Sequence, residues 1–435
     1  MGNIAKFAIL LSCIFFGSAF GRSIPKFTAA HSVLVDGVIE SGTILSSEND
    51  PSVLVSEINE QLMYSIGQLN GLSGGVPDMA KTKITLGRVN ALSSGRFQVS
   101  YRAALKIAWP LEQSFPKSYN LILPSQGNYD FLQSFFAKFG SDENSGKKCL
   151  AAEVHAVEMG NFWYYYRPLK RDCGLKLSPK EVVKTAVNLS YGRDNTEGKS
   201  PEYKKVWEDG KVVATLIFGM ADAEKDSPYD AGILAIQDTV REAFENYGFP
   251  TWSNVENLTE DFVPSKNTPV LHFKFALAQG ELDLVLILVE DIKAVYPGSE
   301  IEKIYNERTM NSDFVSYSGH SGLGANIRKL ANMGNFVPGQ YQIFLINGCD
   351  TFAYVDEALA KAHEKVNPGS ARYKYFDILT NAMPSFFHMN ARSNMAVITA
   401  LVEGKKTYQE ILAGFDPNQR AVVTGEEDNA YPNPF

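Results

Sequence analysis

The sequence predicts an α/β protein: a mostly parallel C-terminal sheet with helices on both faces, preceded by an α+β N-terminal domain. From Lys211 onward, apolar runs of strand length alternate with helical patterns, which is typical of βα units. Before that point, several strand-like runs follow one another with only short turns between them. We therefore expect an α+β domain over residues 22–200 and an α/β domain over residues 201–435.

The N-terminal domain should contain two helices and several strands. Leu54, Ile58 and Leu62 have helical spacing, and Asp50 followed by Pro51 is a helix start signal. A polar run over residues 188–201, rich in Gly, Asn and Ser, predicts a linker or a solvated loop. In chain order we expect a strand over 33–39, a helix over 51–69, a hairpin of strands over 82–92 and 97–108, a strand over 119–123, a helix over 128–139 and a strand over 153–166.

The C-terminal elements follow from continuous apolar runs, because strands of a sheet covered on both faces are apolar throughout. Residues 282–295 fit either a strand or the start of a helix. In chain order we expect a strand over 212–220, a helix over 230–247, strands over 270–278 and 282–289, a strand ending before His320, a helix over 325–333, a strand ending before Cys349, a helix over 352–364, a strand over 376–382 and a long helix over 392–415.

The first residues have the pattern of a secretory signal peptide over residues 1–21. Lys6 precedes an apolar run from Phe7 to Phe20, and small residues stand before Arg22. We expect a secreted or periplasmic protein; the alternative is a lipoprotein anchored at Cys13, which ends a Leu-Leu-Ser-Cys sequence. Since no later stretch is long and apolar enough, the sequence predicts no stable membrane span.

Charge and histidine spacing exclude several classes of partner. The formal net charge is −8 and there is no basic stripe, so nucleic acid is not an expected partner. The six histidines are scattered and have no close Cys/His spacing, which argues against a metal site. We expect no cofactor, and the sequence leaves the oligomeric state open.

Three cysteines remain after signal cleavage: Cys149, Cys173 and Cys349. Cys149 and Cys173 flank one aromatic-rich segment, so we hypothesise that they form a disulfide and leave Cys349 outside it. In the alternative, all three are buried thiols that serve as small hydrophobic residues.

Two apolar strands end in reactive side chains, one in His320 and the other in Cys349. The two residues are 29 positions apart, about one strand–helix–strand unit, so they should meet at the carboxyl edge of the sheet. An imidazole beside a thiol can act as its base and can later protonate a leaving amine. Small residues around them leave backbone amides open to an oxyanion. The alternative is a structural thiol at a strand end.

At these residues the chain resembles clan CD, the cysteine peptidases that include caspases, gingipains, clostripain and legumain. Their pattern is an apolar strand ending in His and Gly, then another ending in a small residue and the nucleophilic Cys. The resemblance extends from Val212 to about Phe415 and includes residues 400–412, which look like a closing helix. It implies a caspase-like fold and an endopeptidase that acts on a protein or peptide through a thioester acyl-enzyme, with His320 as base and Cys349 as nucleophile.

The chain departs from this pattern at two places. Ser321 follows the histidine directly, with Gly322 one residue later, and Gly348 precedes the cysteine where the family has Ala or Ser. We expect Ser321, Gly322 and Gly348 to support the loops whose backbone amides bind the oxyanion. The departures also leave open a catalytically inactive caspase-like relative that serves as a binding or surface protein.

Acids near strand ends are candidates for a substrate pocket. Asp222, Asp313 and Asp350 would suit a basic substrate side chain, although each also fits a helix cap or a solvated loop. Residues 22–200 have no counterpart in the resemblance and would be a propeptide, an adhesive module or a wall of the substrate cleft.

A serine hydrolase is a further alternative, because Gly319-His320-Ser321-Gly322 is similar to a nucleophile elbow. Leu323 stands where that motif requires Gly. Ser321 would need His363 or His388 as its base, with Asp356 or Asp377 as the third member.

Overall fold

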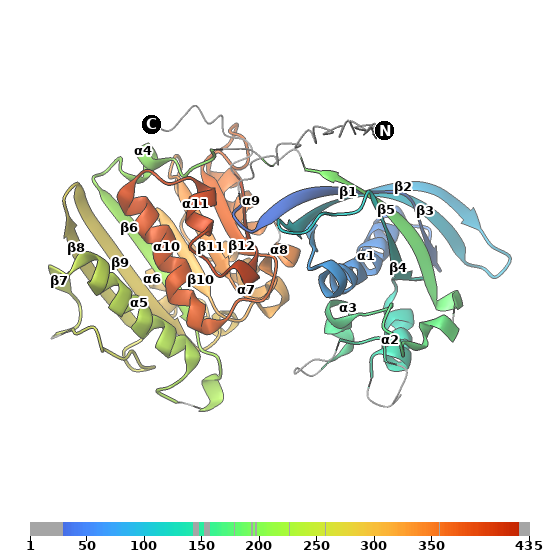
Figure 1. The fold of residues 1–435 in the computed structure, drawn as a ribbon, viewed down its shortest axis with the longest axis horizontal. Coiled ribbons are helices and arrows are strands. Elements are labelled where there is room, and N and C mark those ends of the chain that lie inside the picture. Colours follow the sequence, from blue (N-terminus) through green and yellow to red (C-terminus); the bar gives the residue numbers. More distant parts are fainter. Residues whose placement is uncertain are drawn as a thin grey trace, which may run out of the picture.

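The protein is a mixed α/β structure with two sheets, one antiparallel and one mostly parallel (Figure 1). A computed structural model describes residues 29–141, 148–151, 157–177, 179–192, 195, 198–225, 227–256, 258–355 and 357–425. We call the described residues up to 195 the N-terminal part and those from 198 onward the C-terminal part. The expected signal segment over residues 1–21, Cys13 and Asp356 lie outside the described residues.

The N-terminal sheet has five strands in the order β2-β3-β1-β5-β4, and all its pairings are antiparallel. Helix α1 (Pro51–Ser73) packs against it and is capped at its start by Asp50, whose side chain accepts hydrogen bonds from the first free amides. Gly74 ends this helix in the left-handed conformation. The strands are β1 (Ser32–Ser46), β2 (Val76–Ala91), β3 (Phe97–Pro110), β4 (Ser118–Pro124) and β5 (Val182–Tyr191).

Two predictions in the N-terminal part were wrong. Strand β5 occupies residues 182–191, of which residues 188–191 were expected to be loop. Thr185, Val187 and Leu189 are buried at alternate positions, but the polar residues between them make this short period-2 pattern difficult to recognise in the sequence. Of the strand expected over residues 153–166, residues 153–156 lie outside the described residues, residues 159–165 are helical, and Tyr166 forms only an isolated bridge with Leu150. The aromatic residues there are buried without the alternation of a strand. The helices here are α2 (Tyr129–Phe139), α3 (Phe162–Tyr165) and the 3₁₀ turns Met159–Asn161, Gly174–Leu177 and Pro179–Glu181.

The predicted disulfide is confirmed. Cys149 and Cys173 are bonded and close the segment that carries α3. Cys349 takes no part in a disulfide. Within the described residues, no helix combines the length and the apolarity needed to cross a bilayer.

The C-terminal sheet has the order β13-β12-β11-β10-β6-β9-β8-β7. Its five central strands run parallel, and β7, β8 and β13 are antiparallel to their neighbours. The central strands are buried along almost their whole length, which explains why their sequences are mostly apolar. The strands are β6 (Lys211–Gly219), β7 (Trp252–Ser253), β8 (Val270–Leu277), β9 (Gly280–Val289), β10 (Phe314–Ser318), β11 (Gln342–Asn347), β12 (Phe376–Asn381) and β13 (Ala421–Thr424).

Helices cover both faces of this sheet. Leu216 and Leu345 belong to a core that includes α5 and α10, which lie in front of the sheet in Figure 1. Their chain neighbours Ile217 and Phe344 point to the opposite face of the sheet. They belong to a second core with α6, α7 and α9. The helices are α4 (Tyr203–Val206), α5 (Ala231–Tyr247), α6 (Glu300–Arg308), α7 (Ala325–Asn332), α8 (Thr351–Tyr354), α9 (Ala358–Val366), α10 (Asn390–Glu403) and α11 (Tyr408–Leu412).

Several expected boundaries in the C-terminal part also change. The helix expected over 352–364 is two helices, α8 and α9, and the one expected over 392–415 divides at Gly404, whose positive φ of 69° ends α10. Residues 282–289 belong to strand β9, so the helical alternative is wrong there. Helix α6 and strand β13 were not predicted.

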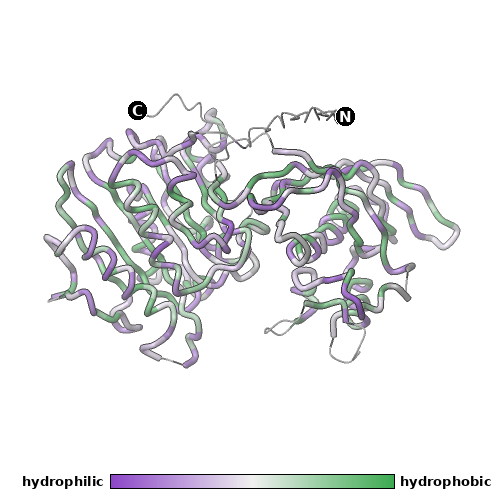
Figure 2. The backbone as a smooth tube through the Cα atoms, in the orientation of Figure 1, coloured by the Kyte–Doolittle hydropathy of each residue, from purple (hydrophilic) through white to green (hydrophobic). Residues whose placement is uncertain are grey.

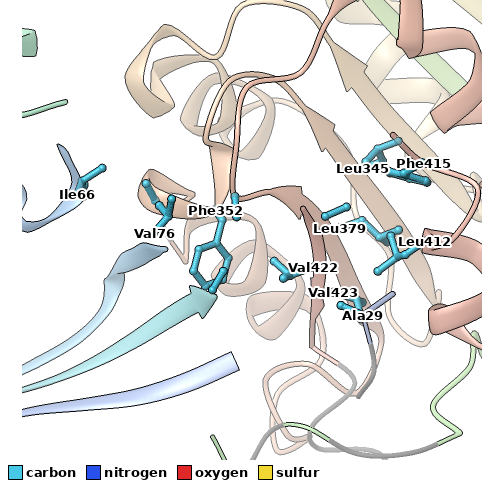
Figure 3. Close-up of a cluster of buried hydrophobic side chains, with 14 of the residues drawn as sticks. Ala29, Ile66, Val76, Leu345, Phe352, Leu379, Leu412, Phe415, Val422 and Val423 are labelled. Atoms are coloured by element: carbon cyan, nitrogen blue, oxygen red, sulfur yellow. The ribbon is translucent and has the colours of Figure 1, made fainter. Parts of the chain in front are cut away.

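The two parts share one hydrophobic core. Phe352 of α8 lies beside Val76 of β2 in Figure 3, and both are almost fully buried. Figure 2 shows hydrophobic residues concentrated along the strands of both sheets. Because α8 begins directly after Asp350, the N-terminal part is packed against the segment that follows Cys349.

Candidate active site

His320 and Cys349 leave the sheet at the same edge. Strands β10 and β11 are parallel, and Ser318 pairs with Asn347 in their register. His320 and Cys349 each follow two residues beyond this pair. The amide of Gly319 also donates to the carbonyl oxygen of Asn347 (3.1 Å), so the contact between the two segments continues beyond the strands. The structure therefore brings the two predicted residues to neighbouring positions at the carboxyl edge.

Hydrogen bonds hold the backbone of the His320 loop, while the residue itself is exposed. The carbonyl oxygen of His320 accepts hydrogen bonds from Tyr317 Oη (2.8 Å) and Asn326 Nδ2 (2.6 Å). The imidazole Nε2 lies 3.1 Å from the carbonyl oxygen of Ala221, and the ring contacts Phe387 edge-on. A carbonyl oxygen only accepts, so Nε2 carries the proton and Nδ1 is the basic nitrogen of the neutral ring.

Cys349 is half-buried, and its surroundings shift the pKa of its thiol in opposite directions. Burial and the neighbouring Asp350 carboxylate raise the pKa of Cys349 above its ordinary value. The backbone amide of Ser385 opposes this shift by hydrogen bonding to the sulfur, which favours the thiolate. A base is therefore needed to form the thiolate at neutral pH.

The loops around the two residues are closely packed. Gly348 has no room for a side chain, because an added Cβ would lie 2.9 Å from the carbonyl oxygen of Gly319 and 3.2 Å from Ser321 Cβ. This crowding explains a glycine where the peptidase pattern has Ala or Ser. Ser321 is buried, and Gly322 has a φ of 56°, which favours glycine.

The three candidate pocket acids are not gathered in one place. Asp222 follows β6 at the carboxyl edge and is paired with Lys225, which holds the pKa of that carboxyl below its usual value. Asp350 is at the same edge but is fully buried. Asp313 precedes β10 and therefore lies at the opposite edge, where it accepts a hydrogen bond from the amide of Val213 (2.7 Å). The prediction of Asp313 as a strand-end acid was wrong, because β10 begins directly after it.

Asp350 is bound by the N-terminal part. Its Oδ2 accepts a hydrogen bond from Tyr164 Oη (2.6 Å) and its Oδ1 accepts one from Asn70 Nδ2 (3.3 Å). Burial raises the pKa of Asp350 to about 7, although the bond from Tyr164 and the charge of Arg167 oppose this shift. Asp350 therefore faces the interface between the two parts.

A buried amide cluster beneath Cys349 was missed in the sequence. Asn347 Oδ1 accepts hydrogen bonds from Asn381 Nδ2 (2.7 Å), Ser385 Oγ (2.7 Å) and Gln419 Nε2 (2.9 Å), while its Nδ2 donates to Asn390 Oδ1 (3.0 Å). Asn381 Nδ2 also donates to the carbonyl oxygen of Gly348 (3.1 Å). The signal was present: Asn347 and Asn381 each end an apolar strand.

Two of the residues proposed for a serine hydrolase, His363 and Asp377, lie away from Ser321. His363 is buried against Gln342, the first residue of β11, and therefore lies towards the edge opposite Ser321. Burial lowers its pKa to about 4. Asp377, the second residue of β12, bonds to Tyr341 and Tyr408 near that opposite edge. His388 is exposed in the 3₁₀ turn Phe387–Met389, next to the residue that contacts His320.

A pocket of about 250 Å³ opens at the ends of β6 and β9. Its lining includes Met220, which directly precedes the residue that binds His320, together with Glu290, Asp291 and Tyr296. In the part of the chain that the structure describes, no three or more His, Cys, Asp and Glu side chains are grouped as a metal site.

Comparison of the chain with protein-family models, with curated proteins and with solved structures gave no match.

Proposed function

We propose that the protein is a caspase-like cysteine endopeptidase with His320 and Cys349 as its dyad. The observation that carries the proposal is the register of β10 and β11, which delivers an imidazole and a thiol from equivalent positions of adjacent strands. The likeness of the two strand ends to clan CD supports the same assignment. The catalytic unit in this proposal is residues 201–435, with the substrate chain lying across the carboxyl edge of the sheet.

Each chemical step has a group to perform it. His320 takes the proton of the Cys349 thiol, and the resulting thiolate attacks the peptide carbonyl carbon. Backbone amides near Ser321, Gly322 and Gly348 stabilise the oxyanion. The C–N bond then breaks, His320 protonates the leaving amine, and a thioester remains on Cys349. A water molecule, deprotonated by His320, hydrolyses this thioester and restores the free thiol.

Thiol labelling tests the dyad directly. Cys349 in the native protein should react with iodoacetamide at pH 7 at least ~tenfold faster than in His320→Ala, because one unit of thiol pKa changes the thiolate fraction tenfold. Intact mass gives the rate, and Cys349→Ala identifies the labelled site. Equal rates in the native protein and in His320→Ala would exclude an activated pair.

Peptide cleavage tests the reaction itself. A diverse peptide mixture followed by mass spectrometry should show products that both Cys349→Ala and His320→Ala abolish. His388→Ala is the matched control, since that imidazole is also exposed and lies close to the site. Products lost in His388→Ala and Ser321→Ala but kept in Cys349→Ala would instead support the serine hydrolase.

An inactive caspase-like binding protein is the second candidate. The raised pKa of Cys349 favours it, because burial and the neighbouring carboxylate both disfavour the nucleophilic thiolate. In that case neither cleavage nor His320-dependent labelling would occur, and Cys349→Ala would leave binding properties unchanged.

We also propose export to an oxidising compartment. The Cys149–Cys173 disulfide supports it, since such bonds persist outside the reducing cytosol. N-terminal sequencing of the mature protein should begin near Arg22; an N-terminus at a lipidated Cys13 would indicate the lipoprotein alternative, and an intact Met1 would contradict export.

A further inference from the structure

Two residues other than glycine have a positive φ in the described chain, Asp350 (50°) and Arg420 (48°). Both reach the N-terminal part through their side chains. Arg420 donates to the carbonyl oxygen of Gly74 (2.9 Å) and pairs with Glu112 (3.4 Å). Such a conformation is unfavourable for most residues and persists where surrounding contacts impose it. At Asp350, those contacts come largely from the other part of the molecule.

The Asp350 carboxyl is bound at both oxygens. Tyr164 of α3 donates to one and Asn70 of α1 donates to the other, and the side chain is completely shielded from solvent. The charged or titratable groups that act on it are Tyr164 and Arg167 from the N-terminal part and Cys349 from its own loop. Two separate helices of the N-terminal part therefore fix the residue adjacent to Cys349.

The next residues are fixed as well. Thr351 Oγ1 donates to the carbonyl oxygen of Ile346 (2.8 Å) and accepts from the amide of Asn381 (3.0 Å), which ties the loop to β11 and β12. Phe352 then packs beside Val76 of β2 (Figure 3). The loop from Gly348 to Thr351 is thus held between the C-terminal sheet on one side and the N-terminal part on the other.

We propose that the N-terminal part is required for the reactivity of the site, because Tyr164 and Asn70 position Cys349 through Asp350. This inference rests on the proposed function in treating Cys349 as the reactive group. Asp350 is a positioning residue in this scheme, because it acts on the position of the thiol and does not touch substrate. Residues up to 195 would then be required for reactivity, which a removable propeptide would not be.

The chain offers a closely matched pair of variants. Tyr164→Phe removes the hydroxyl that binds Asp350. Tyr166→Phe makes the same change two residues away, at a buried hydroxyl that has no hydrogen-bond partner among the described residues. We expect Tyr164→Phe to slow the labelling of Cys349 by iodoacetamide at pH 7 by about fivefold, the factor that corresponds to one hydrogen bond. Tyr166→Phe should label at the native rate.

A second pair of variants separates the positioning effect of the Asp350 side chain from the effect of its charge. Asp350→Asn keeps an acceptor for Tyr164 and tolerates a positive φ, whereas Asp350→Ala does neither. Across a series of pH values, Asp350→Asn should label at least as fast as the native protein and with a lower pH midpoint, because the carboxylate that raises the thiol pKa is gone. Asp350→Ala should label slowly at pH 7. Asn70→Ala, which leaves the aromatic segment intact, should also slow labelling.

Equal rates for Tyr164→Phe and Tyr166→Phe, or an Asp350→Asn variant as slow as Asp350→Ala, would overturn the inference. These outcomes are distinct from a failure of the proposed function. Labelling that depends on His320 but not on Tyr164 refutes only the positioning role. Labelling that depends on Tyr164 but not on His320 refutes the dyad and leaves the positioning role standing.

Discussion

Ser318 and Asn347 stand opposite each other in the parallel register of β10 and β11, and this pairing determines where His320 and Cys349 emerge. Neighbouring strands are about 4.8 Å apart, so two side chains that leave at equivalent positions are within reach of each other by small loop adjustments. A shift of one residue in this register would turn one of the two segments towards the opposite face. The features that fix the register and the loops are therefore the ones to test.

The buried amide cluster should be a major source of stability at the carboxyl edge. Asn347→Ala removes the acceptor that three donors share, those of Asn381, Ser385 and Gln419. We expect a loss of about 1–3 kcal/mol in the free energy of unfolding. Chemical denaturation measures it, with Asn311→Ala at an exposed asparagine as the control. Equal stability of the two variants would mean that water replaces the lost bonds.

Gly348 should not tolerate a methyl group. In Gly348→Ala the new Cβ would press on the carbonyl oxygen of Gly319 and on Ser321, which moves the two loops apart. We expect destabilisation of about 1–3 kcal/mol together with slower labelling of Cys349. Gly160→Ala is the control, because a Cβ there meets no atom within 4 Å. If Gly348→Ala behaves like this control, the close packing has no role in placing the thiol.

Asp313 should make the protein less stable as the pH rises. Burial raises its pKa to about 8 from an ordinary value of 3.8, so the folded protein keeps a proton that the unfolded chain releases. Its contribution is fully present below about pH 4 and is lost as the pH rises through about 8. The melting temperature of Asp313→Asn should therefore decline less between pH 5 and pH 9 than that of the native protein.

The matched control for this pH experiment is Glu260→Gln, at an exposed acid. Asp78 and Asp350 also have pKa values raised to about 7 by burial, so some pH dependence should persist in Asp313→Asn. Parallel curves for the native protein and Asp313→Asn would show that Asp313 does not titrate between these pH values.

The disulfide should stabilise the segment that carries Tyr164. Cys149 and Cys173 are 24 residues apart, and closing a loop of that size contributes about 3 kcal/mol. Cys149→Ser combined with Cys173→Ser should lower the free energy of unfolding by about this amount. Dithiothreitol should destabilise the native protein similarly and leave the double variant unchanged. A further drop in the double variant would point to an effect of the reductant elsewhere.

The sequence was most informative for strands that are buried on both faces of the sheet. The runs 212–219, 314–318 and 342–347 are buried throughout and mostly apolar, because helices cover both faces of the sheet. The disulfide was predictable because two cysteines flank one compact aromatic segment. Strand β5 was harder to recognise, since only Thr185, Val187 and Leu189 point inward and polar residues alternate with them.

The sequence by itself determined the α/β architecture and the placing of His320 and Cys349 after successive apolar strands, because these depend on local periodicity. The spacing of Cys149 and Cys173 also favoured their disulfide. Only the tertiary structure decided that Asp313 lies at the far edge and that Asp350 is bound by Tyr164, which is 186 positions away. It also decided how Asn347, Asn390 and Gln419 meet beneath the thiol. Contacts of this kind join residues distant in the chain, and their hydrogen bonds depend on packing that no short pattern encodes.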